Sequence, residues 1–204
     1  EIMSSDWSSD VCSSDLEFAY HQAEFPEVVD ELYDALLQLM RRRNELIAAG
    51  PGEFVCILEN FTAETVGAAR LEKYHMPVYD ELVPQLHDAG KVVGVHYDGK
   101  TKGVVEQFGR SPVDCIESLT LPPEGDQTYE EARRAWPEKL FWAHVRISDY
   151  QLPPAELKQL VLDMVEAGSV GGRRFALEVS EHLPVNWTES LPVVLEALEE
   201  TRQE

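Results

Sequence analysis

The sequence has few basic residues and no long apolar run. Lys and Arg number 17 among 204 residues, whereas Asp and Glu number 38, so the formal net charge is −21. Duplex nucleic acid is bound by a cationic face that displaces counterions, so we expect no nucleic-acid partner. No stretch of about 18 apolar residues occurs, which excludes a membrane-spanning helix, and we expect no membrane partner.

Cysteine is also scarce. The three cysteines are Cys12, Cys56 and Cys115, and no two of them form a CxxC pair. This excludes a disulfide scaffold and a cysteine-rich zinc module. A reducing cytoplasm is the simplest setting for such a chain. The hydrophobic share of 44% is typical of a globular protein with a sizeable core.

The first 16 residues, EIMSSDWSSDVCSSDL, have neither helical nor strand periodicity. A disordered tail is one interpretation. The segment from Asp6 to Leu16 also resembles a translated sequencing adapter, so we treat residues 1–16 as a non-native segment. Without these residues, which include four acidic and no basic ones, the net charge is −17. We therefore expect that the natural chain was cut near Glu17 and that its N-terminal part is missing.

From residue 17 to residue 204, strand patterns and helix patterns alternate. Apolar runs predict strands over 54–58, 92–95, 113–118, 140–145 and 175–179. Helical spacing predicts helices over 25–49, 77–89 and 102–108, and others that begin near residues 129, 154 and 187. Without hairpin signals between them, the strands should be parallel. No Gly-rich dinucleotide motif follows a strand, so a (β/α)₈ barrel is favoured over a doubly wound sheet.

Ionisable side chains lie at or just beyond the C-terminal end of every predicted strand. They are Glu59, His96, Asp98, Glu117, His144, Glu178 and His182. In a barrel these ends converge on one mouth, where active sites form. A carboxylate beside a buried strand end is costly unless it is paired, hydrogen-bonded or metal-bound. The pattern therefore favours a site over a set of structural polar residues.

His96 and Asp98 point to the same side of an extended segment because side chains alternate along a strand. They could share a divalent ion, with Glu178, His182 or Glu117 as the third ligand. They could also transfer protons without a metal. In a third interpretation they are a hydrogen-bonded pair beside the turn at Gly99.

Three segments of the sequence, in their order and with their spacing, resemble the uroporphyrinogen decarboxylase superfamily. They are KYHMPVYDELVPQLHDAGKVVGVHYDGKTKGVVEQFGRSPVDCIESLTLPPEGD, AWPEKLFWAHV and RRFALEVSEHLP. The similarity extends from about Phe54 to Leu198. It implies the C-terminal five βα units of a (β/α)₈ TIM barrel, with the N-terminal strands missing. Residues 17–204 would then be a partial barrel domain.

The superfamily includes the decarboxylase of haem synthesis and zinc-dependent methyltransferases that act on corrinoid proteins and thiols. The methyltransferase branch has His-x-Cys where this chain has His96 and Asp98, and its distant Cys is replaced in the segment from Glu178 to His182. A thiolate zinc site is therefore not supported, and a metal such as zinc would have nitrogen and oxygen ligands. The Arg-rich motif and the principal catalytic Asp of the decarboxylase branch lie upstream of the matching region.

The resemblance implies a truncated enzyme that is inactive on its own. The expected reaction is methyl transfer from a small methylated substrate, with a corrinoid protein as the candidate acceptor. Decarboxylation of a tetrapyrrole acid and non-catalytic binding of a small ligand remain alternatives. The candidate catalytic residues are Glu59, Glu117, His144 and Glu178. The candidate metal ligands are His96, Asp98 and His182.

Overall fold

A computed structural model describes residues 17–59, 62–179 and 183–202, and the chain divides into two units, residues 1–49 and 50–204. In the first unit, residues 17–24 are helical and α2 (Pro26–Ala49) follows. The predicted helix over 25–49 is thus confirmed. Its apolar stripe remains largely exposed, since Val28, Leu32, Leu36 and Leu39 are each more than half accessible.

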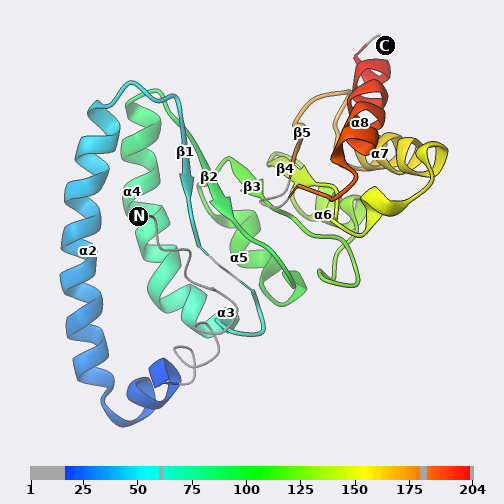
Figure 1. Cartoon of the computed structure of the whole chain (residues 1–204). Helices are drawn as coiled ribbons and strands as arrows, with labels where there is room; N and C mark the ends of the chain where they lie inside the picture. Colours follow the sequence, from blue (N-terminus) through cyan, green and yellow to red (C-terminus); the bar gives the residue numbers. More distant parts are fainter. Residues whose placement is uncertain (1–16, 60–61, 180–182, 203–204) are drawn as a thin grey trace. The chain divides into compact units, whose positions relative to one another are not determined.

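The second unit contains a parallel sheet whose five strands follow one another in sequence order (Figure 1). The strands are β1 (Phe54–Ile57), β2 (Val92–His96), β3 (Cys115–Glu117), β4 (Leu140–His144) and β5 (Phe175–Glu178). Each strand pairs in parallel with the next. All five predicted strands are therefore present. β3 is shorter than predicted because Ser118 has a φ of 66°, which ends the extended backbone at Glu117.

Helices connect the strands. They are α3 (Gly67–Arg70), α4 (Met76–Asp88), α5 (Val105–Arg110), α6 (Tyr129–Ala135), α7 (Pro154–Gly168) and α8 (Trp187–Thr201). A π-helical turn, Leu71–His75, joins α3 to α4, and 3₁₀ turns cover Lys102–Val104 and Asp149–Gln151. Among the described helices, none combines the length and the apolar character that crossing a membrane requires.

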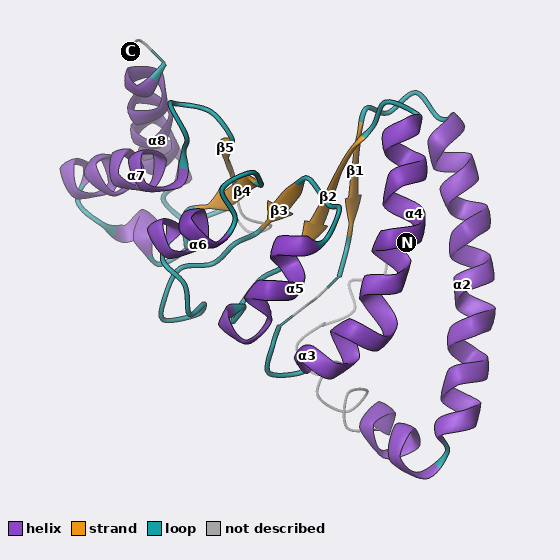
Figure 2. Ribbon diagram, turned by 180° about the vertical axis from the view of Figure 1, so that it is seen from behind, coloured by secondary structure: helices purple, strands orange, loops and turns teal. Residues whose placement is uncertain are grey.

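The order of the strands decides which fold classes remain. Right-handed crossovers between consecutive neighbours place the helices on one side of the sheet. α4, α5 and α6 lie on the same side in Figure 2. A doubly wound sheet would reverse its strand order at a switch point, and the described strands show no reversal. The observed α/β arrangement is compatible with part of an α/β barrel.

Alternation along β2 defines the two faces of the sheet. Val93 and Val95 are fully buried on the helix-covered face, and Tyr97 continues this set by stacking on Phe108 of α5, with 3.9 Å between ring centroids. Val92, in contrast, is 44% exposed. Gly94 and His96 share the face of Val92 because side chains alternate with a period of two. We call the face that carries Val92, Gly94 and His96 the open face.

One local helix pattern in the sequence is not realised in the structure. Asn186 stands just before α8 and Glu189 follows three residues on, which is the pattern of a capping box, but the Asn186 side chain makes no cap bond. Its Oδ1, the atom that would cap the helix, accepts instead from Nε2 of Gln151 over 3.1 Å, and its amide nitrogen donates to the carbonyl of Tyr150 over 2.7 Å. A capping box is present at α6, between Thr128 and Glu131. α4 continues through Pro84 as one helix.

Cationic side chains hold the loops around the N-terminal ends of the strands. The Lys139 ammonium donates to the carbonyls of Ser111 and Val113 over 2.6 and 2.5 Å. Arg133 of α6 donates to the carbonyls of Gly168 and Lys139, each over 2.6 Å, and its guanidinium lies 3.9 Å from the centroid of a phenylalanine ring in β4. This end of the sheet therefore has a structural role.

Candidate functional site

The C-terminal ends of four strands bring ionisable side chains together. His96 ends β2, Glu117 ends β3, His144 ends β4 and Glu178 ends β5. In the register of the sheet, His96 is opposite Glu117, and His144 is opposite Glu178. Because all the strands are parallel, these four ends lie at the same edge of the sheet.

Close interactions connect three of these residues. The His96 ring nitrogen Nδ1 lies 2.5 Å from Oε2 of Glu117, and both side chains are mostly buried, with 21% and 12% exposed. Glu178 interacts with Glu117 as well, since the side chain and the charge of Glu117 are among the causes that raise the pKa of Glu178. We call His96, Glu117 and Glu178 the carboxyl-pair site. Two carboxyl groups in contact cannot both be ionised at little cost, so one of them holds a proton.

The surroundings determine which carboxyl group is protonated. Burial by itself would raise the pKa of Glu117, but hydrogen bonds from His96 and Glu178 and the charges of His96 and His144 outweigh it, so this pKa is lowered. Burial, followed by the hydrogen bond and the charge of Glu117, raises the pKa of Glu178 to about 8. At neutral pH the site therefore contains an ionised Glu117 and a neutral Glu178 that can donate a proton.

His144 adds a second imidazole at this edge. Its Nδ1 lies 3.3 Å from the hydroxyl oxygen of Ser118, which follows β3 in a left-handed conformation. Burial lowers the pKa of His144, although the charges of Glu117 and Asp98 oppose the shift. A neutral imidazole can accept or donate a proton near neutral pH. The unusual φ of Ser118 costs free energy, and such strain is concentrated at functional sites.

Cys56 of β1 also contacts the carboxyl pair, and the sequence alone did not single it out for the site. Its sulfur lies 3.9 Å from Oε2 of Glu117. Burial first, and then the charges of Glu117 and Glu178, raise the pKa of this thiol to about 12. Cys56 is therefore a protonated thiol that donates to the carboxylate, and it is not a nucleophile in this state.

Glu59 makes its contacts elsewhere. It follows β1 and accepts hydrogen bonds from Tyr79 and from Nδ1 of His75, the latter over 2.9 Å. Its partners Tyr79 and His75 belong to α4 and to the π-helical turn before it, so Glu59 lies toward the helices that cover the sheet. The structure thus brings together Glu117, Glu178 and His144, with Glu59 in a separate cluster. Nothing in the sequence pattern indicated the contact of His75 with Glu59.

The three expected metal ligands are not all described. His96 lies in the carboxyl-pair site, and Asp98 is half-buried two residues beyond β2. His182 lies outside the described residues. Within residues 17–59, 62–179 and 183–202, no three His, Cys, Asp or Glu side chains come close enough together to hold an ion.

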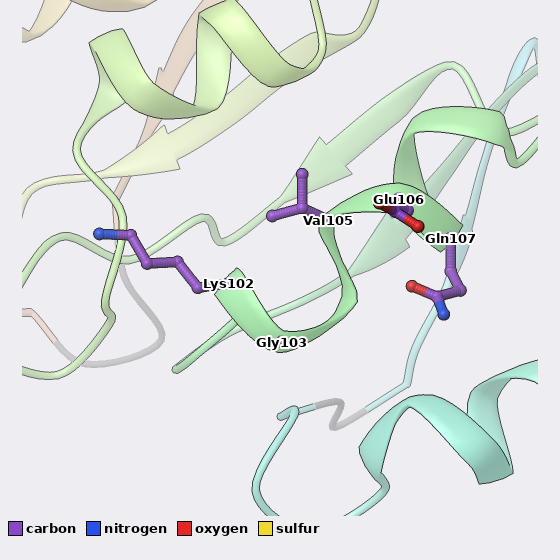
Figure 3. A pocket seen from close by; sticks show the side chains of 5 residues that line it. All are labelled: Lys102, Gly103, Val105, Glu106 and Gln107. Carbon is purple, nitrogen blue, oxygen red and sulfur yellow. The ribbon is translucent and has the colours of Figure 1, made fainter.

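A pocket elsewhere on the second unit has a different chemical character. It is lined by Lys102, Gly103, Val105, Glu106 and Gln107, at the start of α5 (Figure 3). Lys102 extends away from Glu106 and Gln107 and pairs with Glu131 over 3.0 Å. No residue of the carboxyl-pair site lines this pocket, so it is not part of the candidate site.

No protein-family model and no curated protein matches this chain.

Proposed function

We propose that the chain is part of an enzyme of the uroporphyrinogen decarboxylase superfamily that transfers a methyl group from a small methylated substrate to a corrinoid partner. The resemblance over residues 54–198 supports this proposal. A parallel sheet in sequence order also supports it, because the last five units of a (β/α)₈ barrel have this order. The ionisable residues lie at the strand ends where the active sites of barrels are built.

The observation that carries the proposal is the contact of His96 with Glu117 at the edge where β3 and β5 end, together with Glu178, whose pKa burial and Glu117 raise to about 8. When a methyl group leaves an oxygen or nitrogen atom as a cation equivalent, the bonding electrons stay on that atom. The neutral Glu178 gives its proton to this leaving atom, and the methyl group goes to a nucleophile of the partner. Glu178 then recovers a proton from water. General acid catalysis of this kind contributes roughly 10²–10⁴-fold to a rate.

Each residue of the site has a role in this step. Glu117 stabilises the protonated form of Glu178 before the transfer, because its negative charge disfavours a second carboxylate nearby. His96 binds Glu117 and keeps it ionised. His144 is a candidate for returning the proton. We further propose that His96, Asp98 and His182 would hold a divalent ion in the full-length enzyme.

The test uses the full-length enzyme that contains this chain, because the chain alone is expected to be inactive. It measures methyl transfer to reduced cobalamin by absorbance, with methanol, methylamines and methoxy compounds as donors. Glu178→Gln retains an amide donor for Glu117 but has no transferable proton. We expect a rate loss of about 10²-fold or more. Glu106→Gln, an exposed glutamate outside the site, is the matched control and should keep the full rate. An unchanged rate in Glu178→Gln would show that Glu178 is not the acid.

Two further arms separate the alternatives. Uroporphyrinogen is offered as a substrate, and its decarboxylation without any methyl transfer would replace the proposed reaction by the decarboxylase alternative. A chelator is added to the methyl-transfer assay, and an unchanged rate would refute a role for the metal. If the full-length enzyme consumes no donor but binds one of the compounds, the protein functions as a binding module and the enzymatic proposal is wrong.

A further inference from the structure

The long helix α2 carries an apolar stripe that is exposed. Its members are Val28, Leu32, Leu36, Leu39 and Leu46, and their exposed fractions lie between 51% and 70%. Because successive residues of a helix are rotated by about 100°, these five side chains fall within an arc of about 80°. We call them the α2 stripe. They form one continuous apolar strip along most of a helix that is about 36 Å long.

The α2 stripe is not the part of the helix that the chain buries. The buried residues of α2 are Val29 and Asn44, and both lie outside the arc of the stripe. The apolar stripe of a helix in a globular protein is normally covered. An exposed contiguous apolar patch is typical of a surface that binds another protein. The stripe is therefore a candidate interface.

The charges of α2 are divided between its two halves. Residues 26–37 contain four acidic and no basic side chains, whereas residues 38–49 contain Arg41, Arg42 and Arg43 and one acidic side chain, Glu45. Two such helices repel each other in a parallel pair, because like halves meet. They attract each other in an antiparallel pair, because the acidic half of each meets the basic half of the other.

Glu31 and Arg42 define the register of such a pair. Both side chains are exposed, and they are separated by about three helical turns, so they lie along the same edge of the α2 stripe. A two-fold axis perpendicular to α2, midway between these residues, brings Glu31 of each copy to Arg42 of the other. The same axis brings Leu32 of each copy close to Leu39 of the other, because these leucines are placed almost symmetrically about it.

We propose that α2 is a dimer interface, in which it pairs antiparallel with α2 of a second copy of this chain. The charge pattern favours a second copy over an unrelated partner, because α2 itself carries both complementary halves. A two-fold contact uses the same patch on both copies and closes at two. The proposal involves neither the carboxyl-pair site nor a substrate, so it can fail separately from the proposed function.

The first test measures the mass of the full 204-residue chain by sedimentation equilibrium over the micromolar range. We expect a monomer–dimer equilibrium. Leu32→Glu combined with Leu39→Glu places charges in the apolar contact and should weaken dimerisation by roughly 100-fold or more. Leu195→Glu is the matched control, because Leu195 is 60% exposed on α8, and it should leave the equilibrium unchanged. Glu is a strong helix former, so circular dichroism should show an unchanged helix content in all variants.

The second test exchanges charges to determine the orientation of the helices. Glu31→Arg alone and Arg42→Glu alone each bring like charges together at two symmetric positions, and each should weaken the dimer roughly ten-fold. The two substitutions combined restore opposite charges and should return the dissociation constant to within about two-fold of the native value. A combined variant that is as weak as the single variants would overturn the antiparallel pairing.

Three other results would also overturn the proposal. The first is a native chain that stays monomeric over the whole concentration range. The second is association that the combined leucine substitutions leave unchanged, because another surface then forms the contact. The third is a monomer whose urea midpoint these leucine substitutions lower, because the α2 stripe then packs on a segment of the same polypeptide.

Discussion

Glu178 makes the free energy of unfolding depend on pH in a way that a single substitution can isolate. Its pKa is raised from 4.5 to about 8 in the folded chain. Between these values the folded state holds a proton that the unfolded state has released. Stability therefore decreases as pH rises through this window, because the unfolded state binds fewer protons. Below about pH 4.5 the contribution is fully present, and above about pH 8 it is lost.

The size of this pH effect on the free energy of unfolding follows from the pKa shift of Glu178 and from the burial of its side chain. A shift of about 3.5 units corresponds to about 5 kcal/mol when each unit is worth about 1.4 kcal/mol. Glu178 is only half-buried, and solvent screens its interaction with Glu117, so we expect about 2 kcal/mol. Glu178→Gln does not titrate. From pH 5 to pH 9, the free energy of unfolding should decrease by about 2 kcal/mol more in the native chain than in this variant.

Urea unfolding, followed by circular dichroism at pH 5, 7 and 9, measures the difference. Glu117, whose pKa is lowered, stays ionised in the folded state over this range. His144 has a lowered pKa and adds stability as pH rises, but it does so equally in both proteins. The comparison therefore isolates Glu178. Parallel pH profiles of the native chain and Glu178→Gln would refute the assignment of the proton to Glu178.

The sheet was predictable because its strands are apolar runs that end at polar residues or turns. A local pattern identifies such runs, and all five are strands in the structure. Parallel strands place their C-terminal ends together, so the common edge of His96, Glu117 and Glu178 also followed from the sequence. The proton shared by the carboxyl pair did not follow, because it depends on a distance between side chains from separate strands.

The contacts of Glu59 show where the sequence was insufficient. The end of β1 was predicted, but a turn between Ile57 and Glu59 ends the strand alternation, and the side on which Glu59 lies follows from its contacts with His75 and Tyr79. The π turn that brings His75 to Glu59 has no periodic signal, since it interrupts a helical pattern by one residue. Asn186 shows the converse case, because its local cap pattern is present but its side-chain oxygen accepts from Gln151 and its nitrogen donates to the carbonyl of Tyr150. Contacts across elements decided all three positions.

Two further predictions address other parts of the second unit. Cys56 should react slowly with iodoacetamide at pH 7, because burial and then the charges of Glu117 and Glu178 raise the pKa of its thiol to about 12. Glu117→Gln removes one of these charges and should speed the reaction. An unchanged rate by mass spectrometry would contradict this. Arg133→Ala should lower the free energy of unfolding by about 3 kcal/mol, since the guanidinium joins α6 to the carbonyls of Gly168 and Lys139 and removal leaves these acceptors unpaired. Arg134→Ala, at the exposed neighbouring position, should change it by less than about 0.5 kcal/mol. Equal urea midpoints for the two variants would mean that the carbonyls find water instead, and that Arg133 does not hold the N-terminal edge together.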